Sequence, residues 1–240
     1  MKDKKILYPV YDYGELNVTI SKRNNKLGNI PAFNTLPGNR PIKKNDGTQL
    51  TNIVGTCGKH CKECFNDCYS VRYIKCHHNS TVRAYANNTI IMRNDGEKLR
   101  KAIKEYCEKN IVRYFRFHTS GELESVEQLK LYCDICNDNP DIIFYIYTKA
   151  FDILQAWIEK FVKFPINLVV NLSQWNDNLD GLSSRLLNQC NVFAYDDGET
   201  DLSHMTHCPA VDRKGHETGI TCAQCRRCMK RGSKTAVYAH

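Results

Sequence analysis

Cysteine is the residue type in this chain whose number and spacing point to chemistry. The sequence has 13 cysteines among 240 residues. The count is odd, and no long apolar segment follows the Lys-rich start to act as an export signal, so a complete disulfide framework is a poor interpretation. Two groups of cysteines lie within residues 57–68 and 208–228. Thiolates in close array bind zinc or iron–sulfur clusters, so we expect metal chemistry at both groups.

The first group consists of Cys57, Cys61, Cys64 and Cys68. The residues between them are mostly polar or charged, which is unlike a segment of hydrophobic core. Cys57, Cys61 and Cys64 have the spacing C-x3-C-x2-C, and three thiolates on a four-iron cluster leave one iron open to a substrate. Cys68 is the alternative third ligand. If all four cysteines bound, the cluster would be closed, which suits a structural or electron-transfer site.

The second group consists of Cys208, Cys222, Cys225 and Cys228. The last three have the spacing C-x2-C-x2-C, and Cys208 is followed by a proline, as in bacterial ferredoxin sequences. Zinc ribbons more often pair two separate C-x2-C units, so we favour a second four-iron cluster with zinc as the alternative. Five further cysteines are expected in the core, where free cysteine is common: Cys76, Cys107, Cys133, Cys136 and Cys190.

The elements that must position these residues alternate between strand and helix along residues 50–197. Strands are expected at 50–54, 111–118, 141–147, 166–172 and 192–195, and helices at 97–109, 125–137, 151–162 and 181–189. Repeated βα units predict an α/β fold with a mainly parallel sheet, here a partial (β/α)6-type barrel over residues 50–200. Residues 1–49 are expected to form a hairpin (5–21) and a basic arm, and residues 201–240 a Cys-rich C-terminal cap that holds the second cluster.

Polar residues follow several of the expected strands. Ligands in such folds bind at the carboxyl ends of strands, where a glycine admits close approach and a carboxylate accepts from an ammonium group. An alternative interpretation is that Ser120 caps the next helix and that the other residues are ordinary strand ends. His118, at the end of its strand, is expected to be a hydrogen-bonded histidine rather than a catalytic one. The candidates are Ser120, Gly121, Glu122, Thr148, Lys149, Asn171 and Ser173.

The cysteine spacing after a strand, followed one βα unit later by Ser-Gly-Glu, resembles the radical S-adenosylmethionine (SAM) superfamily. The resemblance implies a [4Fe-4S] cluster on Cys57, Cys61 and Cys64 that chelates SAM, cleaves a C–S bond with one electron and yields a 5′-deoxyadenosyl radical. An electron donor such as flavodoxin or ferredoxin is implied too. The sequence departs from the family in having Glu63 before the third cysteine, with the aromatic Phe65 after it, and Ser120 for the first Gly of Gly-Gly-Glu. The layout also resembles small phage-encoded radical-SAM-like proteins of unassigned function.

The same resemblance implies which residues bind SAM. Ser120, Gly121 and Glu122 would contact its amino group, and the residues that end the next two strands would lie near its ribose and carboxylate. The implied cofactor-binding residues are Phe65, Ser120, Gly121, Glu122, Thr148, Lys149, Asn171 and Ser173.

Composition limits the remaining possibilities. Hydrophobic residues make up 42% of the chain, and no apolar run reaches the roughly 18 residues of a membrane span, so we expect a cytoplasmic globular protein without a membrane partner. The net charge is +8, with the excess in the first 100 and last 40 residues. These basic ends would attract nucleic acid or another anionic substrate. The alternatives to an enzyme are a zinc-binding nucleic-acid module and a two-cluster electron-transfer protein.

Overall fold

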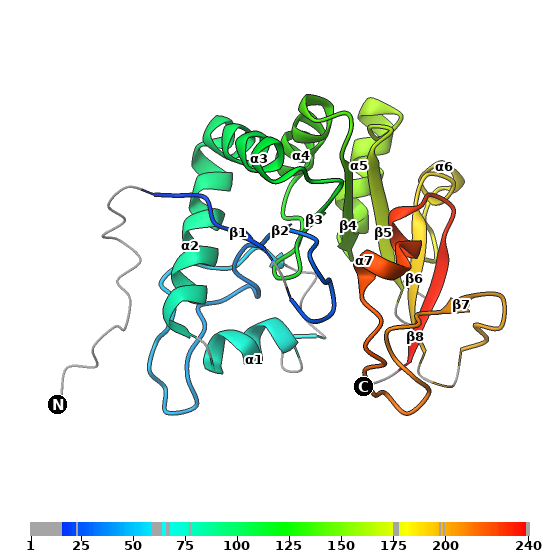
Figure 1. Cartoon of the computed structure of the whole chain (residues 1–240), viewed down its shortest axis with the longest axis horizontal. Helices are drawn as coiled ribbons and strands as arrows, with labels where there is room; N and C mark the ends of the chain where they lie inside the picture. Colours follow the sequence, from blue (N-terminus) through cyan, green and yellow to red (C-terminus); the bar gives the residue numbers. More distant parts are fainter. Residues whose placement is uncertain are drawn as a thin grey trace.

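The computed structural model describes residues 16–22, 24–58, 64–65, 68–76, 78–174, 178–196, 198 and 200–238. Within these residues, eight strands form one open sheet in the order β1-β2-β3-β4-β5-β6-β8-β7 (Figure 1). β1 pairs antiparallel with β2, and every other neighbouring pair is parallel. The strands are β1 (Ile20–Ser21), β2 (Ala32–Phe33), β3 (Tyr114–Phe117), β4 (Ile143–Thr148), β5 (Leu168–Gln174), β6 (Asn191–Asp196), β7 (Thr206–His207) and β8 (Lys234–Tyr238).

Helices precede, connect and follow these strands. They are α1 (Tyr69–Cys76), α2 (His78–Asn94), α3 (Gly96–Asn110), α4 (Val126–Asp138), α5 (Phe151–Phe161), α6 (Ser184–Leu187), α7 (Cys222–Cys225) and the 3₁₀ helix η2 (Arg227–Met229). The apolar sides of α3, α4 and α5 pack on one face of the sheet, whereas α7 lies over the opposite face (Figure 1). The α/β class with a mainly parallel sheet is therefore confirmed.

Strict alternation along the strands separates the two faces of the sheet. In β3, Phe115 and Phe117 enter the main core beneath the helices, while Tyr114 and Arg116 point to the face that carries α7. The same alternation places Tyr145 and other polar residues of β4 and β5 opposite the helices, because successive strand side chains point to opposite faces. One face is thus an apolar core and the other is available for chemistry.

The predicted helices at 97–109, 125–137 and 151–162 are found as α3, α4 and α5, and the expected strands from residue 111 onward are found as β3 to β6. Apolar residues at helical spacing explain this agreement: Leu99, Ile103 and Cys107 are all buried on α3. Helix α4 begins with Ser125, whose side chain accepts from the Gln128 N–H.

The strand expected at 50–54 is wrong. The first parallel strand is instead β2, and residues 50–54 belong to a long loop between β2 and α1. Leu50 is buried against Leu36 and Ile42, and its N–H donates to the Ile42 carbonyl at 2.8 Å. Its apolar character therefore reflects a small core under the loop rather than a place in the sheet.

The sheet takes strands from all three expected segments. β1 and β2 lie before residue 49, and β7 and β8 lie after residue 201, so boundaries at 49/50 and 200/201 divide one sheet. The hairpin expected at 5–21 falls largely outside the described residues. None of the described helices is both long and apolar enough to cross a membrane.

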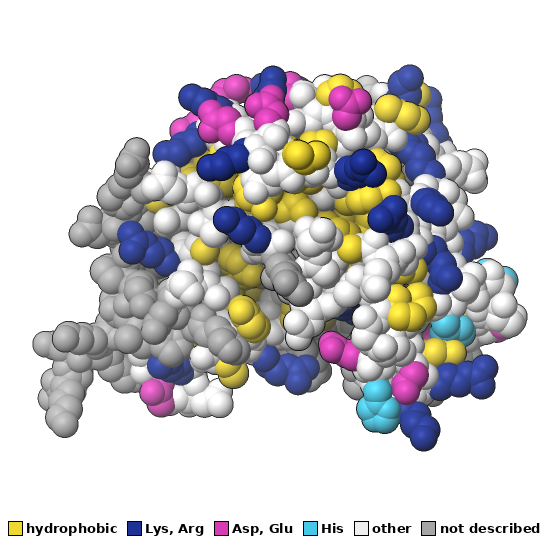
Figure 2. Space-filling view, viewed as in Figure 1, with side chains coloured by type: hydrophobic (Ala, Val, Ile, Leu, Met, Phe, Trp, Pro, Cys, Tyr) yellow, Lys and Arg dark blue, Asp and Glu magenta, His cyan; other side chains and the backbone are white. Residues whose placement is uncertain are grey.

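Charge is distributed unevenly over the surface. In Figure 2, Asp and Glu side chains gather mostly along the upper edge, near α3 and α4, while Lys and Arg side chains spread across the middle and right of the face that carries α7. The open face of the sheet is therefore bordered mainly by positive charge.

Candidate functional site

The first cysteine group lies in the loop that connects β2 to α1. Cys57, Cys64 and Cys68 are partly buried there, and Cys61 lies outside the described residues. The Cys57 N–H donates to the Gly38 carbonyl, and the Gly38 N–H donates to the Cys57 sulfur at 3.1 Å. A donor on sulfur favours the thiolate, which is the form that binds metals.

Cys64 lies where the cysteine loop meets the ends of β3 and β4. Burial raises the pKa of the Cys64 thiol, nearby Lys149 lowers it, and the neighbouring Cys68 and Glu122 raise it. These neighbours come from separate segments, so the fold brings together a cysteine pair, a carboxylate and an ammonium group. Lys149 and Glu122 are two of the residues that the sequence predicted as ligand-binding.

The segment Ser120–Glu122 is fixed to the start of the cysteine loop. The Glu122 N–H donates to the Thr56 hydroxyl at 2.9 Å, and the Ser120 hydroxyl donates to the Thr35 carbonyl. Gly121 has a φ of +93°, and a Cβ there would lie 1.9 Å from the Thr35 Oγ1 atom. Ser125, not Ser120, caps α4, so the helix-cap interpretation is wrong. The segment instead joins the end of β3 to the cysteine loop.

The carboxylate of Glu122 links the ends of β3 and β4. It accepts from the N–H groups of Leu123 at 2.8 Å and Lys149 at 2.9 Å, and it hydrogen-bonds the Thr148 side chain. Burial raises the pKa of this carboxyl, and the same hydrogen bonds lower it in part. A carboxylate offers about four acceptor positions, so it can still accept a further donor. The Thr148 hydroxyl makes this hydrogen bond with Glu122 and also accepts from the Ala150 N–H.

Phe65 and Cys68, two further residues that the sequence singled out, lie in the same loop region. Phe65 lies under the Arg40 guanidinium, 4.2 Å from the ring centroid, and its ring fills the space where a Cβ on Gly38 would stand. Cys68 packs against the small core that contains Leu36 and Leu50, whereas Cys64 is near enough to Lys149 and Glu122 to interact with them electrostatically.

His118 is a buried, fully hydrogen-bonded histidine, as expected. Its Nδ1 lies 3.1 Å from the Thr35 hydroxyl and 3.3 Å from the Ser120 carbonyl. Its Nε2 lies 2.8 Å from the Tyr132 hydroxyl and 3.2 Å from the Gln128 amide nitrogen. Burial lowers the pKa of His118 to about 4, so it is neutral at pH 7. Its role is to hold the Ser120–Glu122 segment in place.

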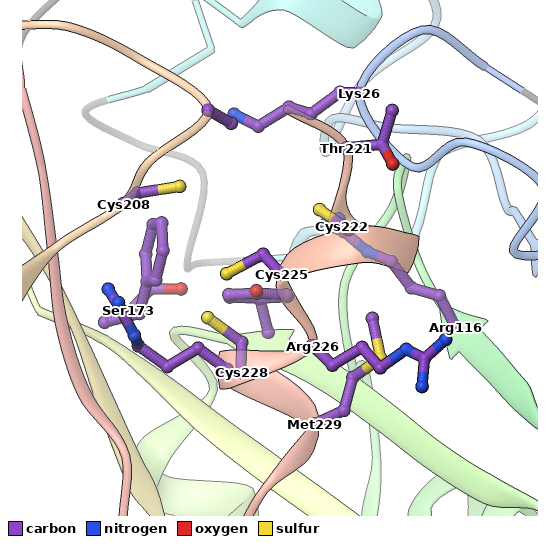
Figure 3. Close-up of a pocket in the computed structure, with 14 residues that line it drawn as sticks. Lys26, Arg116, Ser173, Cys208, Thr221, Cys222, Cys225, Arg226, Cys228 and Met229 are labelled. Carbon is purple, nitrogen blue, oxygen red and sulfur yellow. The ribbon is translucent and has the colours of Figure 1, made fainter. Parts of the chain in front are cut away.

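The second cysteine group surrounds one cavity on the open face of the sheet. Cys208, Cys222, Cys225 and Cys228 all line this cavity of about 210 Å³. Figure 3 shows their four sulfur atoms pointing into the shared space. Burial raises the pKa of Cys222 and of Cys228, and each of these two thiols also interacts electrostatically with Cys208. We call this space the cysteine cavity.

All charged side chains in the rest of the cysteine-cavity lining are cations, and none of the described lining residues is a carboxylate. Lys26, Arg116, Arg226 and Arg227 contribute the positive charges. Nearby Arg116 and Lys26 lower the pKa of Cys222, after the larger opposing effect of burial. The cavity is therefore suited to a group with net negative charge, such as an array of thiolates.

Residues of the sheet complete the base of the cysteine cavity. The Tyr147 hydroxyl hydrogen-bonds the Cys228 sulfur, and Ser173 lines the cavity. The Asn171 amide donates to the Cys228 carbonyl at 3.1 Å. Asn171 and Ser173 thus lie at the second cysteine group, because both point to the face opposite the helices. The buried hydroxyl of Tyr145 lies beside the Arg116 guanidinium, and it is close enough to Cys222 and Cys228 to interact electrostatically.

No three His, Cys, Asp or Glu side chains in the described part of the chain stand close enough to bind a single metal ion.

The other cysteines mostly behave as expected. Cys107, Cys133, Cys136 and Cys190 are buried, but Cys76 is exposed, so its place in the core was predicted wrongly. Cys76 ends α1 on a side away from Val71 and Ile74, the residues that pack inward.

Sequence reasoning missed several residues that shape these sites. Thr35 carries no sequence signal, because it lies far along the chain from the segments that it contacts. Thr56 directly precedes Cys57, which is a weak signal for a loop anchor. Arg116 and Tyr147 could have been assigned to the open face from their alternation with Phe115 and Ile146.

Comparison with known proteins gives a family but no activity. No curated protein and no solved structure matches the chain. A family model described as "Gene product 88" matches residues 17–231, a range that contains both cysteine groups and β1 to β7. Because this range covers most of the 240 residues, the chain belongs to the Gene product 88 family.

Proposed function

We propose that this protein is a radical SAM enzyme with two four-iron clusters, one open and one closed. The observation that carries the proposal is the hydrogen bonding of Glu122. Its carboxylate accepts from the Lys149 N–H at the end of β4, and its own N–H donates to Thr56, the residue before Cys57. The cysteine loop, the segment after β3 and the end of β4 are the segments that the superfamily resemblance singles out. In this proposal the open sheet corresponds to the superfamily's partial barrel, with β2 as the strand before the cysteine loop.

The first site would be held by Cys57, Cys61 and Cys64. When bound there, an open [4Fe-4S] cluster supplies one-electron cleavage of SAM. Cys57 is prepared for this role because the Gly38 N–H already donates to its sulfur. Cys64 is the better third ligand, since Cys68 packs into the small core beside the loop.

The SAM amino acid group would bind at the ends of β3 and β4. Glu122 would accept from the SAM ammonium with acceptor positions that the protein leaves open, and Lys149 would pair with the carboxylate. The left-handed Gly121 lets the backbone approach the loop without a side chain in the way. Thr56, hydrogen-bonded to the Glu122 N–H, would keep the loop and the binding segment in register.

The closed cluster would be held by Cys208, Cys222, Cys225 and Cys228. The donor set fits, because four sulfurs face one cavity that is bordered by cations. The Tyr145 and Tyr147 hydroxyls would donate to its sulfur atoms. Such donors raise the reduction potential of iron–sulfur centres.

The decisive experiment is to reconstitute the protein with iron and sulfide without oxygen, reduce it, add SAM and measure 5′-deoxyadenosine. We expect product from the native chain and none from Cys57→Ala. Cys76→Ala is the matched control, since it removes an exposed thiol away from both sites. If the native protein holds iron yet gives no 5′-deoxyadenosine, the electron-transfer alternative replaces this proposal.

A further inference from the structure

Three cavities adjoin one another on and beside the face that carries α7. The cysteine cavity is the middle one. Arg226 also lines a second cavity of about 420 Å³, and Lys26 also lines a third of about 230 Å³. The second cavity lies beside the start of β3 and the end of α3, and the third lies beside residues 210–220. We call the three together the groove.

The groove carries far more positive charge than the chain as a whole. Its lining includes a single carboxylate, Glu217, among the described residues. The whole chain, in contrast, has 34 Lys and Arg against 26 Asp and Glu. Figure 2 shows basic side chains across this face. The groove's six cations are Lys22, Lys26, Arg113, Arg116, Arg226 and Arg227.

Aromatic rings lie among these cations. Tyr106 and Tyr114 line the second cavity, and both are only partly buried. The Arg226 guanidinium lies 5.4 Å from the centroid of the Tyr114 ring. Rings between cations provide flat apolar surfaces for bases and charges for phosphates, which is the pattern of single-strand binding.

From this charge and the rings, we infer that the groove binds single-stranded nucleic acid. Unpaired bases would stack on Tyr114 and Tyr106, and phosphates would pair with the surrounding cations. The inference depends chiefly on the second cavity, because Lys22 and Arg113 lie outside the cysteine cavity that the closed cluster would fill. It therefore stands whether or not the protein cleaves SAM.

The test is fluorescence anisotropy with a labelled oligothymidylate of about 12 nucleotides, titrated at several salt concentrations. We expect the double variant Lys22→Ala/Arg113→Ala to bind about tenfold more weakly. Its plot of log affinity against log salt should be less steep by about 1.4, or about 0.7 for each lost phosphate contact. The matched control is Lys101→Ala/Lys104→Ala, which removes the same charge from the exposed side of α3.

Stacking is tested separately at Tyr114. Tyr114→Leu should weaken binding about tenfold, while Tyr114→Phe, which keeps the ring, should bind like the native protein. The inference fails if the two double variants lose affinity equally, because binding would then depend on the total surface charge and not on the groove. It also fails if duplex DNA binds as tightly as the single strand. A further contrary result would be displacement of the oligonucleotide by polyglutamate added at the same concentration of negative charges.

Discussion

Gly121 occupies a backbone conformation and a space that together exclude any side chain. Its φ is +93°, and an added Cβ would lie 1.9 Å from Thr35 Oγ1 and 2.8 Å from Thr56 Oγ1. We expect Gly121→Ala to lower the free energy of unfolding by about 3 kcal/mol, from left-handed strain plus displacement of both threonines. Urea denaturation measures the change.

The matched control for this variant is Gly181→Ala. Gly181 has a similar φ of +81° but nothing within 4 Å of an added Cβ. This control should cost about 1 kcal/mol, the strain alone. Equal losses in the two variants would mean that the contact with Thr35 and Thr56 is not tight.

The choice between Cys64 and Cys68 as a ligand is a question about two neighbouring thiols. Cys64 interacts electrostatically with Lys149 and Glu122, while Cys68 packs against the small core. We expect Cys64→Ala to lose the iron of the first site and Cys68→Ala to keep it, as measured by iron content and visible absorption. Retention of iron in Cys64→Ala with loss in Cys68→Ala would make Cys68 the ligand.

His118 makes stability depend on pH. Its pKa is about 4 in the folded protein, against 6.5 for an ordinary histidine, because burial disfavours the imidazolium. The unfolded chain therefore binds the proton more readily, and stability falls as pH drops from about 6.5 to 4. Between pH 6 and pH 5 the native protein should lose about 1 kcal/mol more than His118→Gln does.

Urea unfolding of the metal-free protein at both pH values gives this difference, since the other titrating groups cancel between the two proteins. Identical pH dependence in the native protein and in His118→Gln would show that His118 is not buried as a neutral side chain.

The segment from α7 through η2 is held to the sheet by side-chain amides. Asn171 donates to the carbonyls of Ile146 and Cys228 at 3.1 Å each, and Asn191 donates to the Lys230 carbonyl at 2.9 Å. Asn171→Ala leaves two buried carbonyls without this donor, which costs about 1–3 kcal/mol. We expect faster hydrogen exchange across residues 222–230 than in the native protein.

Asn110→Ala is the control for this element, because it removes an exposed amide that donates to the Tyr106 carbonyl. It should leave exchange in residues 222–230 unchanged. If Asn171→Ala also leaves it unchanged, the cysteine segment is held by contacts other than the sheet amides.

The molecule as a whole should contain two clusters. Two four-iron centres give about eight irons per chain after reconstitution without oxygen. Cys225→Ala should retain about four and keep SAM binding at the first site, since the two cysteine groups occupy separate parts of the fold. Stoichiometric zinc without iron, in protein purified anaerobically, would instead support the zinc-binding module.

The sequence by itself determined the class of fold and the groups of residues that could bind metals or ligands. The α3 pattern of Leu99, Ile103 and Cys107, and the apolar run of β4, depend on local periodicity, which a sequence displays directly. The two cysteine groups are local as well, so their candidates could be named from spacing. Residues 50–54 were mistaken for a strand because a short apolar run looks the same in a loop core as in a sheet.

Only the tertiary structure decided which of these segments meet. Glu122 accepts from the Lys149 N–H because β3 and β4 are parallel neighbours, and Asn171 donates to the Cys228 carbonyl because β5 presents it on the open face. The Cys222 N–H donates to the Lys26 carbonyl at 2.8 Å, which joins the segment before β2 to the segment before β8. Such contacts depend on long-range strand order and on the face to which each side chain points, and neither is encoded in local spacing.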